Sequence, residues 1–220
     1  MSGAYRIVPR RVAFDWRTTP LHWIPDEPTA THVINVLHLL LPAREWLRFR
    51  LSLVAAIEQF TAVLGDWVLR AEGLDRAGAD EVMLDLLRWH GAEEVEHRSV
   101  AFDMYQHCGG SGAARYARRI EGMAVVAPVL AWLWVWGTAY LIRNDPELAG
   151  RLRYSLRAHN QAVAKGLLPT WRELGAAIPR YFRRSYHPSQ EGSLRRAVEY
   201  LTTSPAARAA AGAVGRAAMS

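Results

Sequence analysis

The stretch Trp89–Asp103 constrains the fold most, because it carries acidic and imidazole side chains at helical spacing among apolar residues. In a helix, Glu94 and His97 lie three residues apart on one face, and His90 lies four residues before Glu94 on the same stripe. The apolar neighbours indicate a largely buried helix, and buried charges are rare unless they are paired or bound to a metal. Glu94 and His97 are therefore candidate metal ligands, with a solvated charged helix face as the alternative.

A second carboxylate strengthens the metal hypothesis. Glu-x-x-His on a helix is the half-site unit of dimetal carboxylate bundles, in which the Glu and the His reach one ion from one backbone. Glu58 stands within the apolar segment 53–64, on a helix that looks buried all round, so its carboxylate needs a partner. We expect Glu58 to face Glu94 and His97 as a further ligand; a buried hydrogen bond or an arginine pair is the alternative. Carboxylate and imidazole ligands suit iron, manganese or zinc.

The remaining pattern predicts an all-α fold, since no alternation of strand period is long enough to build a sheet. Four prolines within residues 1–30 predict an extended N-terminal arm, and an Ala- and Gly-rich segment predicts a frayed tail over 204–220. The length of 220 residues suits a single helical domain, with metal-site helices in 31–108 and C-terminal helices in 113–203. The expected helices, each bounded by capping residues or breakers, cover residues 33–41, 43–69, 81–107, 113–142, 145–166, 171–178 and 194–201.

Residues 123–142 form a run of twenty uncharged, mostly apolar residues with arginines on both sides, long enough to span a bilayer. Pro128 lies inside the run, and its tryptophans are central rather than at the ends, which disfavours a spanning helix. We expect a buried or interface helix, with membrane insertion as the alternative. Because a large apolar face needs cover, we also expect attachment to a membrane surface or self-association into a homo-oligomer.

The net charge of +6 comes from arginines spread along the chain, with Lys165 as the one lysine. This distribution is typical of a solvated basic surface; anionic lipid and nucleic acid are the alternatives, and no nucleic-acid-binding motif supports the latter. The single Cys108 excludes an intramolecular disulfide, and we interpret it as a free structural thiol rather than a nucleophile. No secretory signal is recognisable, so we expect a cytoplasmic protein.

Four motifs stand out along the chain, in the segments 31–42, 56–62, 89–103 and 186–189. Together they resemble the bacterial proteins called predicted metal-dependent hydrolases, and the resemblance covers nearly the whole chain. The resemblance implies a ferritin-like bundle whose early helix gives a Glu, whose second gives Glu-x-x-His with a further His, whose third gives a Glu, and whose fourth gives Glu-x-x-His. By this resemblance Glu58 matches the third-helix Glu, and Glu94 with His97 match the fourth-helix pair.

The chain departs from that pattern between Pro42 and Glu58, where the family would have some tens of residues carrying its second helix. No second Glu-x-x-His-x-x-x-His exists in the sequence, so about half of the implied ligands are missing. Glu45 matches either the early Glu or the start of the third helix. The chain is then either a shortened family member with one metal ion or none, or the product of a defective gene or of a wrongly assigned gene model.

Function follows from these alternatives. The first hypothesis is a metal-dependent hydrolase of an unknown small-molecule substrate, with Glu58, Glu94 and His97 as ligands and His90 as a ligand or as a partner of one. Such ligands in a helical bundle also suit dioxygen activation, so a non-haem iron oxidase or oxygenase is the enzymatic alternative. The non-enzymatic alternative is an inactive structural or membrane-associated helical protein.

Overall fold

The computed structural model describes residues 42–146 and 153–208. The chain divides into two units, residues 1–46 and 47–220, and the description below concerns the second one. The expected N-terminal arm, the expected helix 33–41 and most of the expected tail lie outside the described residues, and the single domain stays a prediction.

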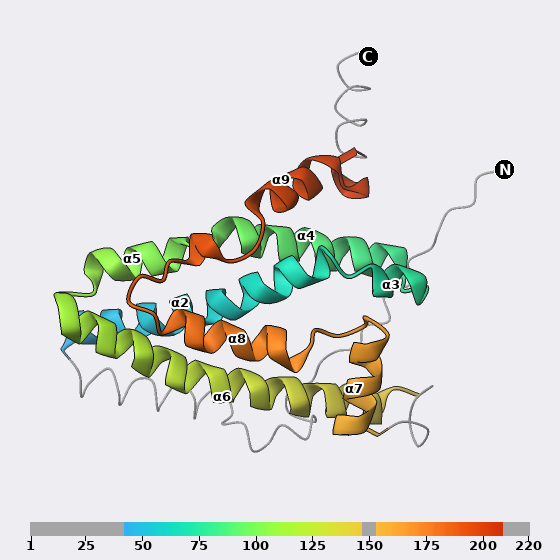
Figure 1. Cartoon of the computed structure of the whole chain (residues 1–220), viewed down its shortest axis with the longest axis horizontal. Coiled ribbons are helices and arrows are strands. Elements are labelled where there is room, and N and C mark those ends of the chain that lie inside the picture. Colours follow the sequence, from blue (N-terminus) through green and yellow to red (C-terminus); the bar gives the residue numbers. More distant parts are fainter. Residues whose placement is uncertain (1–41, 147–152, 209–220) are drawn as a thin grey trace, which may run out of the picture. The chain divides into compact units, whose positions relative to one another are not determined.

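Every regular element of the described residues is a helix, which confirms the all-α class (Figure 1). In chain order the elements are α2 (Ala43–Val68), α3 (Glu72–Arg76), α4 (Glu81–His97), α5 (Val100–Cys108), α6 (Gly112–Asn144), α7 (Leu156–Ala164), α8 (Trp171–Tyr181), the 3₁₀ helix η1 (Pro188–Gln190) and α9 (Leu194–Thr203).

Helix α2 is central because small residues let two other helices approach its backbone. A Cβ atom added to Gly65 would lie 2.3 Å from the carbonyl oxygen of Gly91, so α2 and α4 cross with glycine against glycine. A Cβ atom added to Gly122 of α6 would lie 2.7 Å from the carbonyl oxygen of Ser52. The predicted helix 43–69 is thus confirmed, and its contacts with α4 position the candidate ligands.

The main core lies where α2, α5, α6 and α8 meet. Phe102 of α5 is almost fully buried and makes edge-to-face contacts with Tyr181 and Tyr186, with ring centroids 6.2 and 5.9 Å apart. The buried residues of this cluster are Ala55, Ala56, Ala101, Phe102, Met123, Val126, Tyr181 and Tyr186. A smaller cluster joins α4 to α9 through Ala92, Val95 and Ala197.

Local capping signals determine three helix starts as predicted. The Asp80 carboxylate accepts the N–H of Met83, Ser193 accepts the N–H of Arg196, and Thr170 with Glu173 forms a reciprocal capping box. Residues 72–76, which lie between the predicted helices 43–69 and 81–107, form the short helix α3.

The prediction of one continuous helix over residues 81–107 is wrong, because a turn at residues 98–99 interrupts the helix between α4 and α5. Glu58 accepts the N–H of Ala101, which a continuous helix would use for its own backbone. Arg98 is buried, and its Nε donates to the carbonyl of Pro188 at 3.0 Å. Contacts with distant segments therefore replace helical hydrogen bonds at the junction.

Two further boundaries differ from the prediction. The helix that ends before Gly166 begins at Leu156, where Ser155 provides the N-cap, and not at Asp145. Helix α8 continues through Pro179 to Tyr181. The proline lies in the last turn, so it removes one helical hydrogen bond close to an end where the helix would soon stop.

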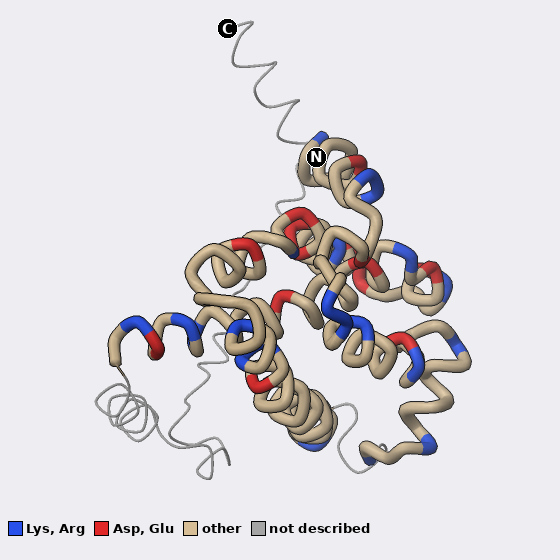
Figure 2. Tube along the Cα trace, turned by 60° about the vertical axis from the view of Figure 1, so that its left-hand side comes forward, with Lys and Arg blue, Asp and Glu red and all other residues tan. Residues whose placement is uncertain are grey.

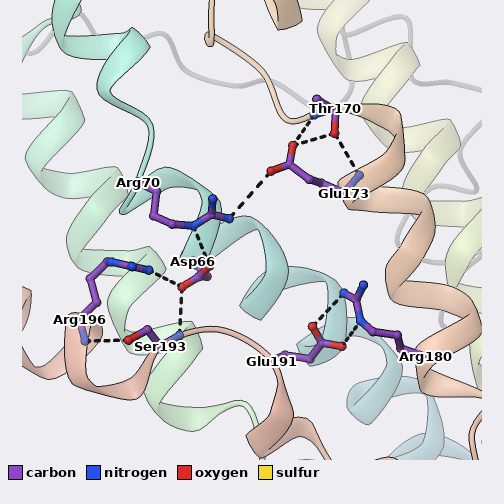
Figure 3. Close-up of polar contacts among 8 residues, drawn as sticks. All are labelled: Asp66, Arg70, Thr170, Glu173, Arg180, Glu191, Ser193 and Arg196. Atoms are coloured by element: carbon purple, nitrogen blue, oxygen red, sulfur yellow. Dashed lines mark hydrogen bonds and ion pairs between the residues drawn. The ribbon is translucent and has the colours of Figure 1, made fainter.

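Two acidic residues hold the C-terminal segment against the bundle (Figure 3). Asp66 of α2 accepts the Ser193 N–H at 3.0 Å and Arg196 Nη1 at 2.9 Å. Glu191, almost fully buried, accepts Arg180 Nε at 2.6 Å and Arg180 Nη2 at 2.8 Å. These pairs join α2 to α9 and α8 to the segment that follows η1.

Helix α6 exposes most of its apolar length. Figure 2 shows a long uncharged stretch of this helix, with charged residues near its two ends. Only 6% of its most apolar window is buried, and by length and composition both α6 and α2 could cross a membrane. The described chain therefore buries Met123 and Val126 but leaves most of the run 123–142 exposed. An interface and a membrane both stay predictions for the exposed part. Its exposed side chains include Val125, Val129, Leu133, Val135 and Leu141.

Candidate metal centre

Glu58 lies in the middle of α2 and faces the first turn of α5. Its Oε2 accepts the N–H of Ala101 at 3.1 Å. Ser99, the N-cap residue of α5, makes no side-chain cap, so Glu58 supplies this cap from another helix. Of the two alternatives to metal binding that were predicted for Glu58, the buried hydrogen bond is thus present. No described arginine or lysine pairs with its carboxylate.

Glu94 and His97, both on α4, lie close enough to Glu58 to act on it electrostatically. The pKa of Glu58 is raised from its ordinary value, first because the carboxyl is partly buried. The Ala101 N–H opposes this shift, the Glu94 carboxylate raises the pKa further, and the imidazole of His97 lowers it. Three of the four predicted ligands, Glu58, Glu94 and His97, therefore lie within electrostatic range of one another.

His90 lies one turn before Glu94, as the i, i+4 spacing predicts. Its Nε2 is 3.5 Å from Glu94 Oε1, and its side chain is 63% exposed against 26% for that of Glu94. The imidazole thus lies at the outer side of the cluster and contacts a candidate ligand.

These side chains do not form a preassembled metal centre. Within residues 42–146 and 153–208, no group of three or more His, Cys, Asp and Glu residues is arranged to hold an ion. Glu58 directs one oxygen to α5, while Glu94 directs one toward His90. The donor chemistry fits a divalent cation, since carboxylate and imidazole are its usual protein ligands, but the ligands would have to turn toward one another.

The structure also answers the question of Glu45. It lies in the first turn of α2, the helix that carries Glu58, so it belongs to the start of that helix and not to an earlier one. The described residues therefore supply the candidate centre from two helices, α2 and α4.

A second polar arrangement was not predicted as a site. His187 Nε2 lies 2.9 Å from Asp103 Oδ1, and His187 Nδ1 lies 2.8 Å from Ser189 Oγ. The Ser189 N–H also donates to Nδ1, so Nε2 is the nitrogen that carries the hydrogen toward Asp103. In the sequence, the segment 186–189 is only one of the four motifs of the family resemblance, and nothing local in it points to Asp103, which is 84 residues away.

Comparison with known protein families gives one result. A family model described as "Predicted metal-dependent hydrolase" matches the chain over residues 8–47 and 44–192. No curated protein and no solved structure matches the chain.

Proposed function

Because the chain belongs to the family of predicted metal-dependent hydrolases, we propose that Glu58, Glu94 and His97 bind one divalent metal ion that serves the hydrolysis of a small-molecule substrate. One observation carries the proposal. The partly buried Glu58 carboxyl has Glu94 and His97 beside it and no cationic side chain paired with it among the described residues. A cation is the partner that such a carboxylate lacks.

Each residue has a distinct part in this proposal. Glu58 keeps Oε2 on the Ala101 N–H, which fixes the carboxylate and leaves Oε1 for the ion. Glu94 and His97 approach from one face of α4, and His90 orients Glu94 through the contact at 3.5 Å. A bound divalent ion would lower the pKa of a water molecule and polarise the substrate, which is the chemistry of hydrolysis.

One ion rather than two follows from the reduced ligand set. A carboxylate from one helix and Glu-x-x-His from its neighbour make half of a ferritin-like dimetal centre. The family match falls into two segments that overlap at residues 44–47, and this supports the loss of a ligand-bearing helix before Glu58. Iron, manganese and zinc all suit the remaining donors.

Metal titration of the metal-free protein tests the proposal. We expect calorimetry with Mn²⁺ or Zn²⁺ to give one ion per chain, and Glu58→Gln, Glu94→Gln and His97→Gln each to weaken binding by about 10-fold or more. Glu72→Gln is the matched control, since Glu72 is 83% exposed and pairs only with Arg76 among the described residues. Equal affinity in the wild type and in all three ligand variants would refute the site.

The same protein tests the oxidative alternative. If the ferrous protein, prepared without oxygen, consumes dioxygen on exposure and hydrolyses no ester or phosphate ester, the oxidase reading replaces the hydrolase.

The contacts of His187 favour a second candidate, which is hydrolysis without a metal. The Ser189 hydroxyl would form a bond to the carbonyl carbon of an ester while its proton passes to His187 Nδ1, and His187 would then protonate the leaving alcohol. Asp103 would hold the Nε2–H throughout. Water would release the acyl group from Ser189 in the same way. Hydrolysis that survives chelation and is lost in Ser189→Ala would favour this centre over the metal site.

A further inference from the structure

A cavity lined by arginines shares no lining residue with the candidate metal centre or with the cluster of Asp103, His187 and Ser189. It has a volume of about 220 Å³ and lies between α5, the first turns of α6 and the segment after α8. Among the described residues, its lining includes three arginines and two tyrosines and no acidic residue: Tyr105, Gln106, Gly112, Ala113, Arg115, Tyr116, Arg119 and Arg184.

Arg119 is the unusual member of this lining. Its side chain is only 3% exposed, yet no carboxylate pairs with it among the described residues. Nη2 donates to the carbonyl of Arg183 at 2.6 Å, whereas the buried Nε has no hydrogen-bond partner in the part of the chain that the structure describes. Burial lowers the pKa of Arg119, which reflects the cost of holding this charge without a counterion.

Aromatic rings partly stabilise the buried charge of Arg119. Its guanidinium carbon lies 5.0 Å from the ring centroid of Tyr116, 5.5 Å from that of Tyr181 and 5.8 Å from that of Phe102. Such contacts hold a cation but leave its N–H groups without an acceptor. The unsatisfied Nε therefore still requires an acceptor that the described chain does not provide.

The other groups at the cavity favour the same kind of ligand. The guanidinium carbon of Arg184 lies 4.6 Å from the ring centroid of Tyr116. Arg115 donates through Nη1 to the carbonyl of Gln106. Both arginines therefore have other N–H groups available for a ligand. Gly112 and Ala113 are the first residues of the 33-residue helix α6, and Ser111 makes no side-chain cap there. The free N–H groups and the positive end of this helix favour an anion.

We propose that this cavity binds a phosphate group, with Arg119, Arg115 and Arg184 as its ligands. Three guanidinium groups offer many N–H donors to a tetrahedral dianion, and arginine pairs with phosphate through two parallel hydrogen bonds. The phosphate belongs either to a soluble phosphate monoester or to a lipid headgroup, and the apolar length of α6 begins beside the cavity. The inference does not depend on the metal centre.

The test uses the full chain and two phosphate sources at constant ionic strength. Inorganic phosphate and glycerol phosphate are titrated by calorimetry and by thermal shift. Vesicles of phosphatidylcholine, with and without phosphatidic acid, are tested by co-sedimentation. Arg119→Met and Arg184→Gln are the test variants, and Arg195→Gln, with its side chain 88% exposed on α9, is the matched control.

We expect the wild type and Arg195→Gln to bind phosphate, and each test variant to bind on the order of tenfold more weakly. Arg119→Met should keep or raise the Tm without phosphate, because an apolar side chain removes a buried charge that has no counterion. Binding of soluble phosphate that the variants weaken assigns the site to a soluble ligand, and binding seen only on phosphatidic acid vesicles assigns it to a lipid.

Two results would overturn the proposal. One is a wild type that binds neither phosphate source. The other is binding that Arg119→Met and Arg184→Gln leave as strong as in the control.

Discussion

The glycine contact between α2 and α4 gives the sharpest prediction about the fold. A Cβ atom at Gly65 would lie 2.3 Å from the carbonyl oxygen of Gly91, whereas ordinary contact begins at 3.4 Å, so Gly65→Ala must separate the two backbones by about 1 Å. Overpacking costs about 1–3 kcal/mol, and the better helix propensity of alanine returns about 1 kcal/mol. The expected net loss is therefore about 0–2 kcal/mol, and a loss of about 1 kcal/mol would lower the Tm by about 2–4 °C.

Gly175→Ala in α8 is the matched control. Its added Cβ would meet no atom of the described residues within 4 Å, so only the propensity acts and the free energy of unfolding should rise by about 0.5–1 kcal/mol. Urea denaturation of both variants measures the difference. If Gly65→Ala proves as stable as Gly175→Ala, close packing of α2 against α4 is refuted, and with it the basis for placing Glu58 near Glu94.

Three further predictions concern charge and exposure. Arg180→Met should lower the free energy of unfolding by about 3 kcal/mol, because it leaves the buried Glu191 carboxylate without its cation; adding Glu191→Gln should recover most of that loss, and a double variant no more stable than the single one would contradict the pairing. The pKa of Glu58 is raised in the folded protein, so its protonated form contributes to the free energy of unfolding. This stabilisation is fully present below the ordinary pKa of a glutamate and is lost as the pH rises through the raised pKa. In metal-free protein the Tm of Glu58→Gln relative to the wild type should therefore increase as pH rises from about 4, and a difference that is constant with pH would contradict the assignment. The exposed apolar face of α6 should make the chain elute above its monomer mass of 24.7 kDa or co-sediment with vesicles, and a monodisperse monomer that ignores vesicles would argue against both forms of cover.

Helices with local signals were predictable from the sequence. Asp80, Thr170 and Ser193 cap the helices that follow them, and the apolar pattern of residues 43–69 corresponds to α2 within one residue. Each of these features depends on residues that are neighbours in the sequence.

Features that depend on distant contacts were missed. The break between α4 and α5 requires Glu58 at the N–H of Ala101 and Arg98 at the carbonyl of Pro188, which are 43 and 90 residues apart. The contact between His187 and Asp103 spans 84 residues. No periodicity or capping rule contains such information, because it arises only when the helices pack.

The candidate centre shows both cases. Helical spacing correctly gave the stripe of His90 and Glu94, which contact each other one turn apart. The sequence also suggested that Glu58 would neighbour Glu94 and His97, but not that one of its oxygens would cap α5. Whether a carboxylate serves a helix, an ion or both depends on geometry that forms across helices.

Metal stoichiometry tests the central claim most directly. Protein purified without added metal, and again after equilibrium dialysis against Fe²⁺, Mn²⁺ or Zn²⁺, is analysed by elemental mass spectrometry beside the double variant Glu58→Gln, His97→Gln. The account predicts one ion per wild-type chain and none in the double variant. Equal metal content in the two proteins, or none in either, would contradict it.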